Sequence, residues 1–163
     1  MIDLYMSSLF LKNANVIDVS TGNTSLQNIR IENGIIQEIG KNVIKNNSAE
    51  SIDLKGDFVI PGLCDAHVHV TAFTADFARL KNTSPFYVGI KALEILRGML
   101  SRGFTTVRDA GGADWGLAKH ISENPTSGPR LLYCGMLFHK LEGMGICEDL
   151  VKIVCINVFV VLG

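Results

Sequence analysis

Several features that would assign this chain to a particular class are scarce or missing. Aromatic residues make up 7% of its 163 residues, charged residues make up 19%, and the formal net charge is −1. The sequence therefore has no basic stripe that would recruit nucleic acid and no basic face for an anionic membrane surface. The apolar stretch Ile153–Gly163 is too short to span a bilayer. We expect neither a nucleic-acid partner nor a membrane partner.

No Cys-x-x-Cys pair occurs among the four cysteines, which are Cys64, Cys134, Cys147 and Cys155. We therefore expect reduced, mostly buried thiols in a cytosolic protein. The start of the chain has no basic region before an apolar core, so we expect no signal peptide and a cytoplasmic location. What is present, 47% hydrophobic residues, is ordinary for one medium globular domain or two small ones.

Residues 1–60 have the pattern of short strands separated by tight turns. The expected strands are Leu9–Val19, Asn28–Glu32, Ile35–Ile39, Ser51–Leu54 and Phe58–Ile60. Asn33-Gly34 is a strong hairpin signal, because both central residues of such a turn need a positive φ. Lys55-Gly56-Asp57 predicts another tight turn. We expect a small antiparallel sheet made of hairpins, without a helix.

Residues 61–135 alternate between strand and helix patterns. The expected strands are Leu63–Val70, Phe104–Arg108 and Arg130–Cys134, the expected helices are Tyr87–Ser101 and Ala113–Ser122, and the connections are Thr71–Pro85 and Asn124–Gly128. Leu63–Val70 is almost entirely apolar, which is typical of a buried strand in a parallel sheet. The alternation predicts the beginning of an α/β barrel or of a doubly wound sheet.

His67-Val68-His69 is the main candidate for chemistry. Residues i and i+2 of a strand point to the same side, so both imidazoles can face one divalent metal ion. They lie where the first barrel-type strand ends, and barrels of this class place their active sites at that end. The alternative is a pair of structural histidines, because a catalytic zinc needs three protein ligands. Two imidazoles also accept zinc, iron, manganese or nickel, so the metal stays open.

Three charged residues accompany this pair. Asp65 lies on the same side of the strand as the histidines but deeper, and we interpret it as a supporting or core-capping carboxylate rather than a ligand. Arg108 and Asp109 end the next strand before a Gly-Gly pair. One interpretation is an ion pair followed by a flexible turn, and the other is a support of the site or a wall of the substrate pocket.

Several motifs together resemble the metal-dependent amidohydrolase superfamily. Those motifs are Leu11–Asp18, Ile31–Gly40 and Ile52–His69. Gly103–Gly112 and Ser127–Leu131 resemble the imidazolonepropionase-like branch, which includes enzymes of the Xaa-Pro dipeptidase (prolidase) type. The resemblance covers residues 9–135.

This resemblance implies an α/β fold in which a partial N-terminal β-sandwich, residues 1–60, precedes the first three βα units of a (β/α)₈ TIM-type barrel, residues 61–135. It also implies one or two divalent metal ions, usually zinc, with His67 and His69 as ligands from the first strand. The implied reaction is hydrolysis of a C–N bond in a small amide, cyclic amide or dipeptide by metal-activated water. A homo-oligomer is compatible with a full-length form.

Other members of the superfamily complete the site with a lysine, two histidines and an aspartate that serves as general base, all on later strands that this chain does not contain. After Gly135, members of this branch commonly continue with a segment similar to Gln-Thr-Gly-Gly-His-Gly-Asp. Codons for Met136–Cys147 can be written so that a shifted frame gives that segment. We therefore predict that residues 136–163 are an out-of-frame tail, against the alternative of a divergent tail with a helix and an apolar strand.

Three hypotheses follow for the chain as a whole. It is a truncated and inactive amidohydrolase, a fragment that assembles with a separately encoded C-terminal half, or a simple His-x-His metal-binding module. A partial barrel would expose the edge of a parallel sheet, which favours aggregation or a partner.

Overall fold

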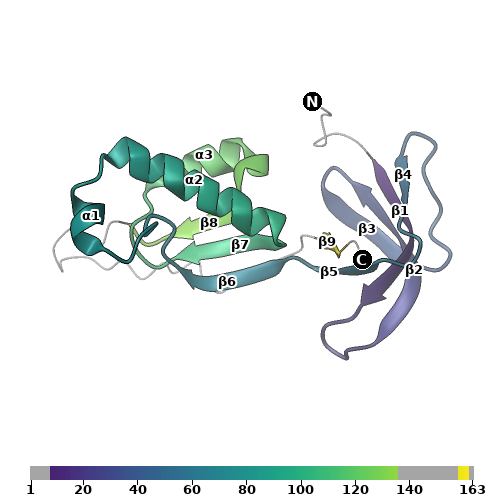
Figure 1. The fold of residues 1–163 in the computed structure, drawn as a ribbon. Helices are drawn as coiled ribbons and strands as arrows, with labels where there is room; N and C mark the ends of the chain where they lie inside the picture. Colours follow the sequence, from purple (N-terminus) through teal and green to yellow (C-terminus); the bar gives the residue numbers. More distant parts are fainter. Residues whose placement is uncertain (1–7, 136–157, 162–163) are drawn as a thin grey trace. The chain divides into compact units, whose positions relative to one another are not determined.

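A computed structural model describes residues 8–135 and 158–161 of this chain. It divides into two compact units, Met1–Pro61 with Val158–Gly163, and Gly62–Asn157. Figure 1 shows a sheet without helices in the first unit and a sheet with helices along it in the second. The structure is therefore of the mixed α and β class that the sequence predicts. None of the described helices is both long and apolar enough to cross a membrane.

The first unit is a six-stranded sheet in the described residues, with the order β3-β2-β1-β5-β9 and with β4 also paired to β1. Its strands are β1 (Leu9–Ile17), β2 (Thr24–Glu32), β3 (Ile35–Gly40), β4 (Glu50–Asp53), β5 (Phe58–Pro61) and β9 (Val158–Val161). β9 pairs antiparallel with β5. The remainder of the predicted out-of-frame tail, including His139, lies outside the described residues.

The hairpin predicted at Asn33-Gly34 is confirmed. β2 and β3 pair antiparallel, and the φ angles are 51° at Asn33 and 73° at Gly34. Both central residues thus have the left-handed conformation that matches the twist of the two strands. Glycine adopts it without steric cost, and asparagine tolerates it better than most residues do.

Replacing Gly34 with alanine is expected to destabilise the first unit by about 1–2 kcal/mol, because an L-residue is strained in the left-handed region. No atom lies within 4 Å of the added Cβ, so the backbone conformation alone is responsible. Gly89 is the matched control, since it also has open space but lies in a helix. Gly89→Ala should stabilise its own unit by about 0.5–1 kcal/mol. Urea unfolding measures both, and a shift of the same sign in both variants would contradict this explanation.

The prediction that residues 1–60 form only hairpins is wrong. β4 and β5 both run parallel to β1, with Leu9–Lys12 of β1 beside β4 and Asn15–Val16 beside β5. The turn at Lys55-Gly56, with φ angles of 50° and 97°, therefore does not reverse the chain. The chain continues in the same direction after this turn, from β4 into β5. The backbone of the turn stays bonded to β1 in three places, from Leu54 N to Lys12 O, from Gly56 N to Asn13 O and from Asn15 N to Asp57 O.

Both faces of this sheet carry buried side chains. On one face a cluster contains Leu11, Ala14, Ile29, Leu54 and Val59. The neighbouring residue Phe10 belongs to a separate cluster with Val43 and Ala49, which lie in the segment between β3 and β4. Because successive residues of a strand point to opposite faces, β1 contributes to both clusters.

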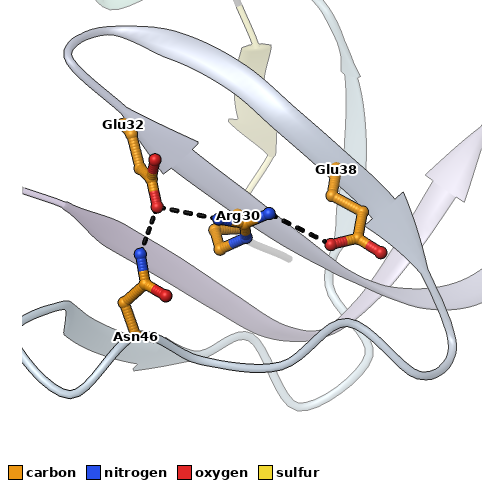
Figure 2. Close-up of polar contacts among 4 residues, drawn as sticks. All are labelled: Arg30, Glu32, Glu38 and Asn46. Atoms are coloured by element: carbon orange, nitrogen blue, oxygen red, sulfur yellow. Dashed lines mark hydrogen bonds and ion pairs between the residues drawn. The ribbon is translucent and has the colours of Figure 1, made fainter.

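A polar cluster connects the segment between β3 and β4 to the hairpin of β2 and β3 (Figure 2). Arg30 of β2 donates to Glu32, at 2.9 Å, and to Glu38 of β3, at 3.2 Å, while Glu32 also accepts from Asn46. The hydrogen bond to Glu32, followed by that to Glu38, holds the pKa of Arg30 above its usual value. The guanidinium therefore stays charged and links both strands of the hairpin.

The second unit contains three parallel strands in the order β6-β7-β8. The elements in chain order are β6 (Leu63–Val68), α1 (Phe77–Lys81), α2 (Pro85–Ser101), β7 (Phe104–Asp109), α3 (Trp115–Glu123), a 3₁₀ turn (Pro125–Ser127) and β8 (Arg130–Tyr133). Figure 1 shows α2 and α3 on the same side of this sheet. The predicted alternation of strands and helices is confirmed for these three strands.

The core of this unit lies between the two helices and the sheet. Its buried residues are Val70, Ala92, Leu96, Met99, Val107, Ala113, Ile121 and Leu131. The spacing of Ala92, Leu96 and Met99 puts them on one face of α2, as the sequence pattern predicts. The short helix α1 was not predicted, since it begins inside a polar connection where Asp76 caps it by accepting from Arg79 N.

β6 is more exposed than its apolar sequence predicts. In the described residues it is an outer strand of the sheet, and Leu63 is 42% exposed, whereas the central strand β7 is mostly buried. The strand also ends at Val68 rather than Val70. The two described cysteines are likewise exposed, contrary to prediction, because Cys64 lies on β6 and Cys134 follows the end of β8.

Candidate functional site

The two histidines of His67-Val68-His69 lie together where β6 ends. His67 is the last residue but one of the strand, and His69 follows the strand directly. Their ring centroids are 5.2 Å apart and the planes meet at 81°. Both side chains are exposed. Two accessible imidazoles are thus available at one point.

The strand is irregular just before this point. Asp65 is paired with Val107 and Val68 with Asp109, so β6 has one more residue than β7 between the two pairs. The strict alternation assumed from the sequence therefore does not hold through His67. The two ring centroids nevertheless lie 5.2 Å apart.

His69 is oriented by the loop after β7. Its Nδ1 lies 3.0 Å from the carbonyl oxygen of Gly111. A carbonyl oxygen only accepts hydrogen bonds, so Nδ1 carries the proton in this contact and Nε2 of the neutral ring keeps a free lone pair. This is the usual arrangement of a histidine that ligates a metal through Nε2.

Asp109 is fully buried, at 0% exposure, and organises that loop. Its Oδ1 accepts from Gly111 N at 2.9 Å and from Ala113 N at 3.1 Å, and its Oδ2 accepts from Val70 N at 2.8 Å. Of the two interpretations of Arg108 and Asp109, the ion pair is therefore wrong for the described residues. Both carboxylate oxygens are already used by backbone donors of two loops.

Arg108 lies beside the histidine segment instead. Its Nη1 donates to Ala66 O at 3.3 Å. Its Nε is buried without a hydrogen-bond partner, and among the described residues the side chain has no ion pair. Arg108 thus brings an uncompensated positive charge to the backbone next to His67.

Asp65 contacts the backbone rather than the rings. Its Oδ1 accepts from His67 N at 3.1 Å. The carboxylate therefore supports the irregular end of β6, where the sheet ladder is interrupted, and it is half-buried. Asp65 thus contacts the main chain of His67, and its role as a supporting carboxylate stays a prediction.

The loops after the strands are joined by glycines that the sequence analysis did not assign. Gly112 has a φ of 120°, and its N–H donates to Gly135 O, beyond β8, at 3.1 Å. A Cβ at this position would overlap Oγ1 of Thr71, two residues after His69. The Gly-Gly pair after Asp109 was the available signal, because consecutive glycines mark backbones that approach one another closely.

The residues present suit a divalent metal ion as part of a site. The donors are two neutral nitrogen ligands, one of them with its tautomer fixed by a carbonyl group. In the part of the chain that the structure describes, no three His, Cys, Asp or Glu side chains come together as a complete site. The described arrangement therefore supplies two ligands.

Comparison with known proteins identifies the family. The amidohydrolase family matches residues 58–152, which include β6, the histidine pair and the loop after β7. The chain belongs to the amidohydrolase family.

Solved structures similar to this chain include a prolidase and a Xaa-Pro dipeptidase. A prolidase in complex with N-methylphosphonate-L-proline is 37% identical, with a TM-score of 0.75, and the match covers 79% of this chain and 32% of that one. A Xaa-Pro dipeptidase with methionine bound in its active site is 28% identical, with a TM-score of 0.66, and the match covers 80% and 34%.

Among curated relatives, the dihydroorotase of Trichlorobacter lovleyi is 43% identical over 63 residues, which is 39% of this chain and 15% of the relative. The chain thus spans about a third of the length of these solved structures.

Proposed function

We propose that this chain contributes the first two metal ligands of an amidohydrolase that cleaves a C–N bond in a small molecule. One observation carries the proposal. The imidazoles of His67 and His69 lie 5.2 Å apart where a parallel strand ends, and Nδ1 of His69 is committed to a carbonyl group. The family membership supports the same chemistry.

His67 and His69 would hold the metal through ring nitrogens, and zinc suits a site of neutral imidazoles. A bound divalent metal would supply Lewis acidity to the scissile carbonyl and to a water molecule. Asp65 supports the backbone of His67, and Asp109 organises the loop that contacts His69. One or two ions would fit the complete site of a longer relative.

A dipeptide with a free carboxylate is the substrate class that we favour. Arg108 carries an unpaired positive charge beside His67, and a guanidinium recognises carboxylates well. The similar prolidase was solved with N-methylphosphonate-L-proline, which is a proline derivative. An amide or a cyclic amide is the alternative, in line with the similarity to dihydroorotase.

The fold that we propose for the complete enzyme is a (β/α)₈ barrel that begins with β6, α2, β7, α3 and β8, after a β-sandwich that includes the first unit. Such barrels place active sites at the carboxyl ends of their strands, where His67 and His69 lie. We further propose a cytoplasmic location, and a homo-oligomer in a full-length form. With two ligands in its described residues, the 163-residue chain alone should bind metal without turnover.

Zinc titration of the metal-free chain tests this proposal. We expect one equivalent of Zn²⁺ to bind in the micromolar range, measured by competition with a chromophoric chelator. Binding should be lost in His67→Ala and in His69→Ala, because one imidazole does not hold the ion. His120→Ala is the matched control, since this half-buried histidine lies on α3, and it should bind zinc as the unaltered chain does.

Three outcomes would overturn parts of the proposal. Unchanged zinc binding in His67→Ala would remove the metal site from the end of β6. Loss of binding in His120→Ala would place the ion elsewhere. Robust hydrolysis of a Xaa-Pro dipeptide by the zinc-loaded chain would refute the expected inactivity, whereas tight zinc binding without turnover is also what a simple His-x-His metal-binding module would give.

A second candidate is an assembly fragment that pairs with a separately encoded half carrying further ligands. The observation that favours it is the exposure of β6, an outer strand in the described sheet with Leu63 42% exposed. An exposed strand of a parallel sheet is a template for further pairing. Native mass spectrometry of the co-expressed halves would detect a one-to-one complex, and its absence would leave the first candidate.

A further inference from the structure

The neutral ring of His69 has one protonated nitrogen and one nitrogen with a free lone pair. Only the nitrogen with the lone pair can ligate a metal. The contact between Nδ1 and Gly111 O, at 3.0 Å, decides which nitrogen that is. The hydrogen bond made by one ring nitrogen sets the role of the other. The position of the Gly111 carbonyl therefore determines whether Nε2 is available.

The Gly111 carbonyl lies between hydrogen bonds to one side chain: Asp109 binds the N–H groups on both sides of it, and Gly112 N, in the same peptide group as the carbonyl, donates to Gly135 O at 3.1 Å. Gly111 N donates to Asp109 Oδ1 at 2.9 Å, and the same oxygen accepts from Ala113 N at 3.1 Å. Gly111 has a φ of 151°, which few other residues adopt, so the loop depends on these bonds and on glycine.

The same carboxylate also holds the other partner of the contact. Asp109 Oδ2 accepts from Val70 N at 2.8 Å, and Val70 is the residue after His69. One fully buried side chain thus holds the backbone that carries the imidazole and, on both sides of the accepting carbonyl, the N–H groups of Gly111 and Ala113. No titration of Asp109 is needed for this role, since only its acceptor oxygens act.

We propose that Asp109 is a positioning residue for His69, and that it sets the Nδ1–H tautomer of this ring through residue Gly111, whose carbonyl accepts from Nδ1. The carboxylate of aspartate accepts hydrogen bonds at both of its terminal oxygens, whereas the amide of asparagine accepts at only one terminal atom. Asparagine in its place would direct an NH₂ group at Val70 N–H or at the N–H groups of Gly111 and Ala113, so one part of the arrangement must open. The consequence for metal affinity depends on the function proposed above, whereas the tautomer does not.

The tautomer is measured directly by long-range ¹H–¹⁵N NMR of the metal-free chain labelled at histidine nitrogens. We expect the Nδ1–H form for His69 in the unaltered chain and a shift towards the Nε2–H form in Asp109→Asn. Zn²⁺ affinity, titrated separately, should fall about 10–100-fold in this variant, as found when partners of metal ligands are removed. The signals of His120 should not move.

Two controls separate positioning from general stability. Asp114→Asn makes the same chemical change at the exposed N-cap of α3, where Asp114 accepts from Leu117 N, and should leave the His69 tautomer unaltered. Leu96→Ala weakens the core of the same unit, removes no hydrogen bond of the loop, and should likewise leave the tautomer unaltered.

The proposal fails if His69 in the unaltered chain has the Nε2–H form, a result that no folding defect of a variant can obscure. It also fails if folded Asp109→Asn keeps both tautomer and zinc affinity. If the tautomer responds as expected but no form of the chain binds zinc, the metal-binding function fails and the positioning role of Asp109 stands.

Discussion

Replacing Leu96 with alanine is expected to destabilise the second unit by about 3–4 kcal/mol, within the range measured for buried leucines. Leu96 is 0% exposed and lies between α2, α3 and the sheet, where it packs with Val107 and Leu131. The cavity cannot close easily, because Gly128 approaches Leu96 so tightly that a Cβ there would lie 2.8 Å from the Leu96 Cβ. Because the surroundings are close-packed and rigid, neighbouring side chains cannot move in to replace the contacts that Leu96 loses.

Urea unfolding followed by fluorescence measures this loss, since the only tryptophan of the sequence, Trp115, lies on α3 of the same unit. Ile90→Ala is the matched control, because Ile90 belongs to the same helix but is 57% exposed. That change should stay within about 0.5 kcal/mol. Similar losses in both variants would mean that the helix does not pack as the structure has it.

The elements that could be predicted from sequence are those determined by local chemistry. Asn33-Gly34 specified its hairpin, because the turn itself requires positive φ at both residues. α2 followed from apolar residues at helical spacing. The structure begins it at Pro85, which the sequence analysis assigned to the preceding connection, because proline suits the first helical position. Strand β7 followed from its β-branched residues and the glycine before it.

The errors concern pairing between distant segments. The tight turn at Lys55-Gly56 has the local signature of a hairpin, yet the strands beside it both pair with β1. Nothing local distinguishes a turn that reverses the chain from one that only displaces it. The prediction that β6 is buried was wrong for the same reason. An apolar strand is buried only where other strands and helices cover it.

The candidate site was predicted in part. His67 and His69 follow from their spacing, and the structure brings their rings together. Support of the site was one of the two interpretations of Asp109, but its three backbone partners could not be predicted, because they belong to two loops that only the register of β6 and β7 aligns. The neighbouring charge of Arg108 suggested an ion pair, which is the simplest local explanation. The carboxylate instead satisfies buried N–H groups that would otherwise lack partners.

Replacing Gly112 with alanine is expected to destabilise the second unit by about 2–4 kcal/mol and to weaken zinc binding. A φ of 120° strains any L-residue by about 1–3 kcal/mol, and the new methyl group would also overlap Oγ1 of Thr71. Relief of that overlap moves the loop that carries Thr71, which begins two residues earlier at His69, the ligand that we propose. The change therefore acts on metal affinity as well as on stability.

A double-mutant cycle with Thr71→Ala separates the two causes. Removal of the Thr71 hydroxyl and methyl groups should restore the part of the stability that is lost through steric overlap. The double variant should therefore be more stable than Gly112→Ala alone. The strain of the positive φ should remain in both, because it belongs to the backbone of residue 112. Equal stability of the two variants would show that no overlap exists at this crossing of loops. Recovery of zinc affinity in the double variant, together with an incomplete recovery of stability, would show that the position of the His69 loop, rather than the overall stability of the unit, governs the metal site.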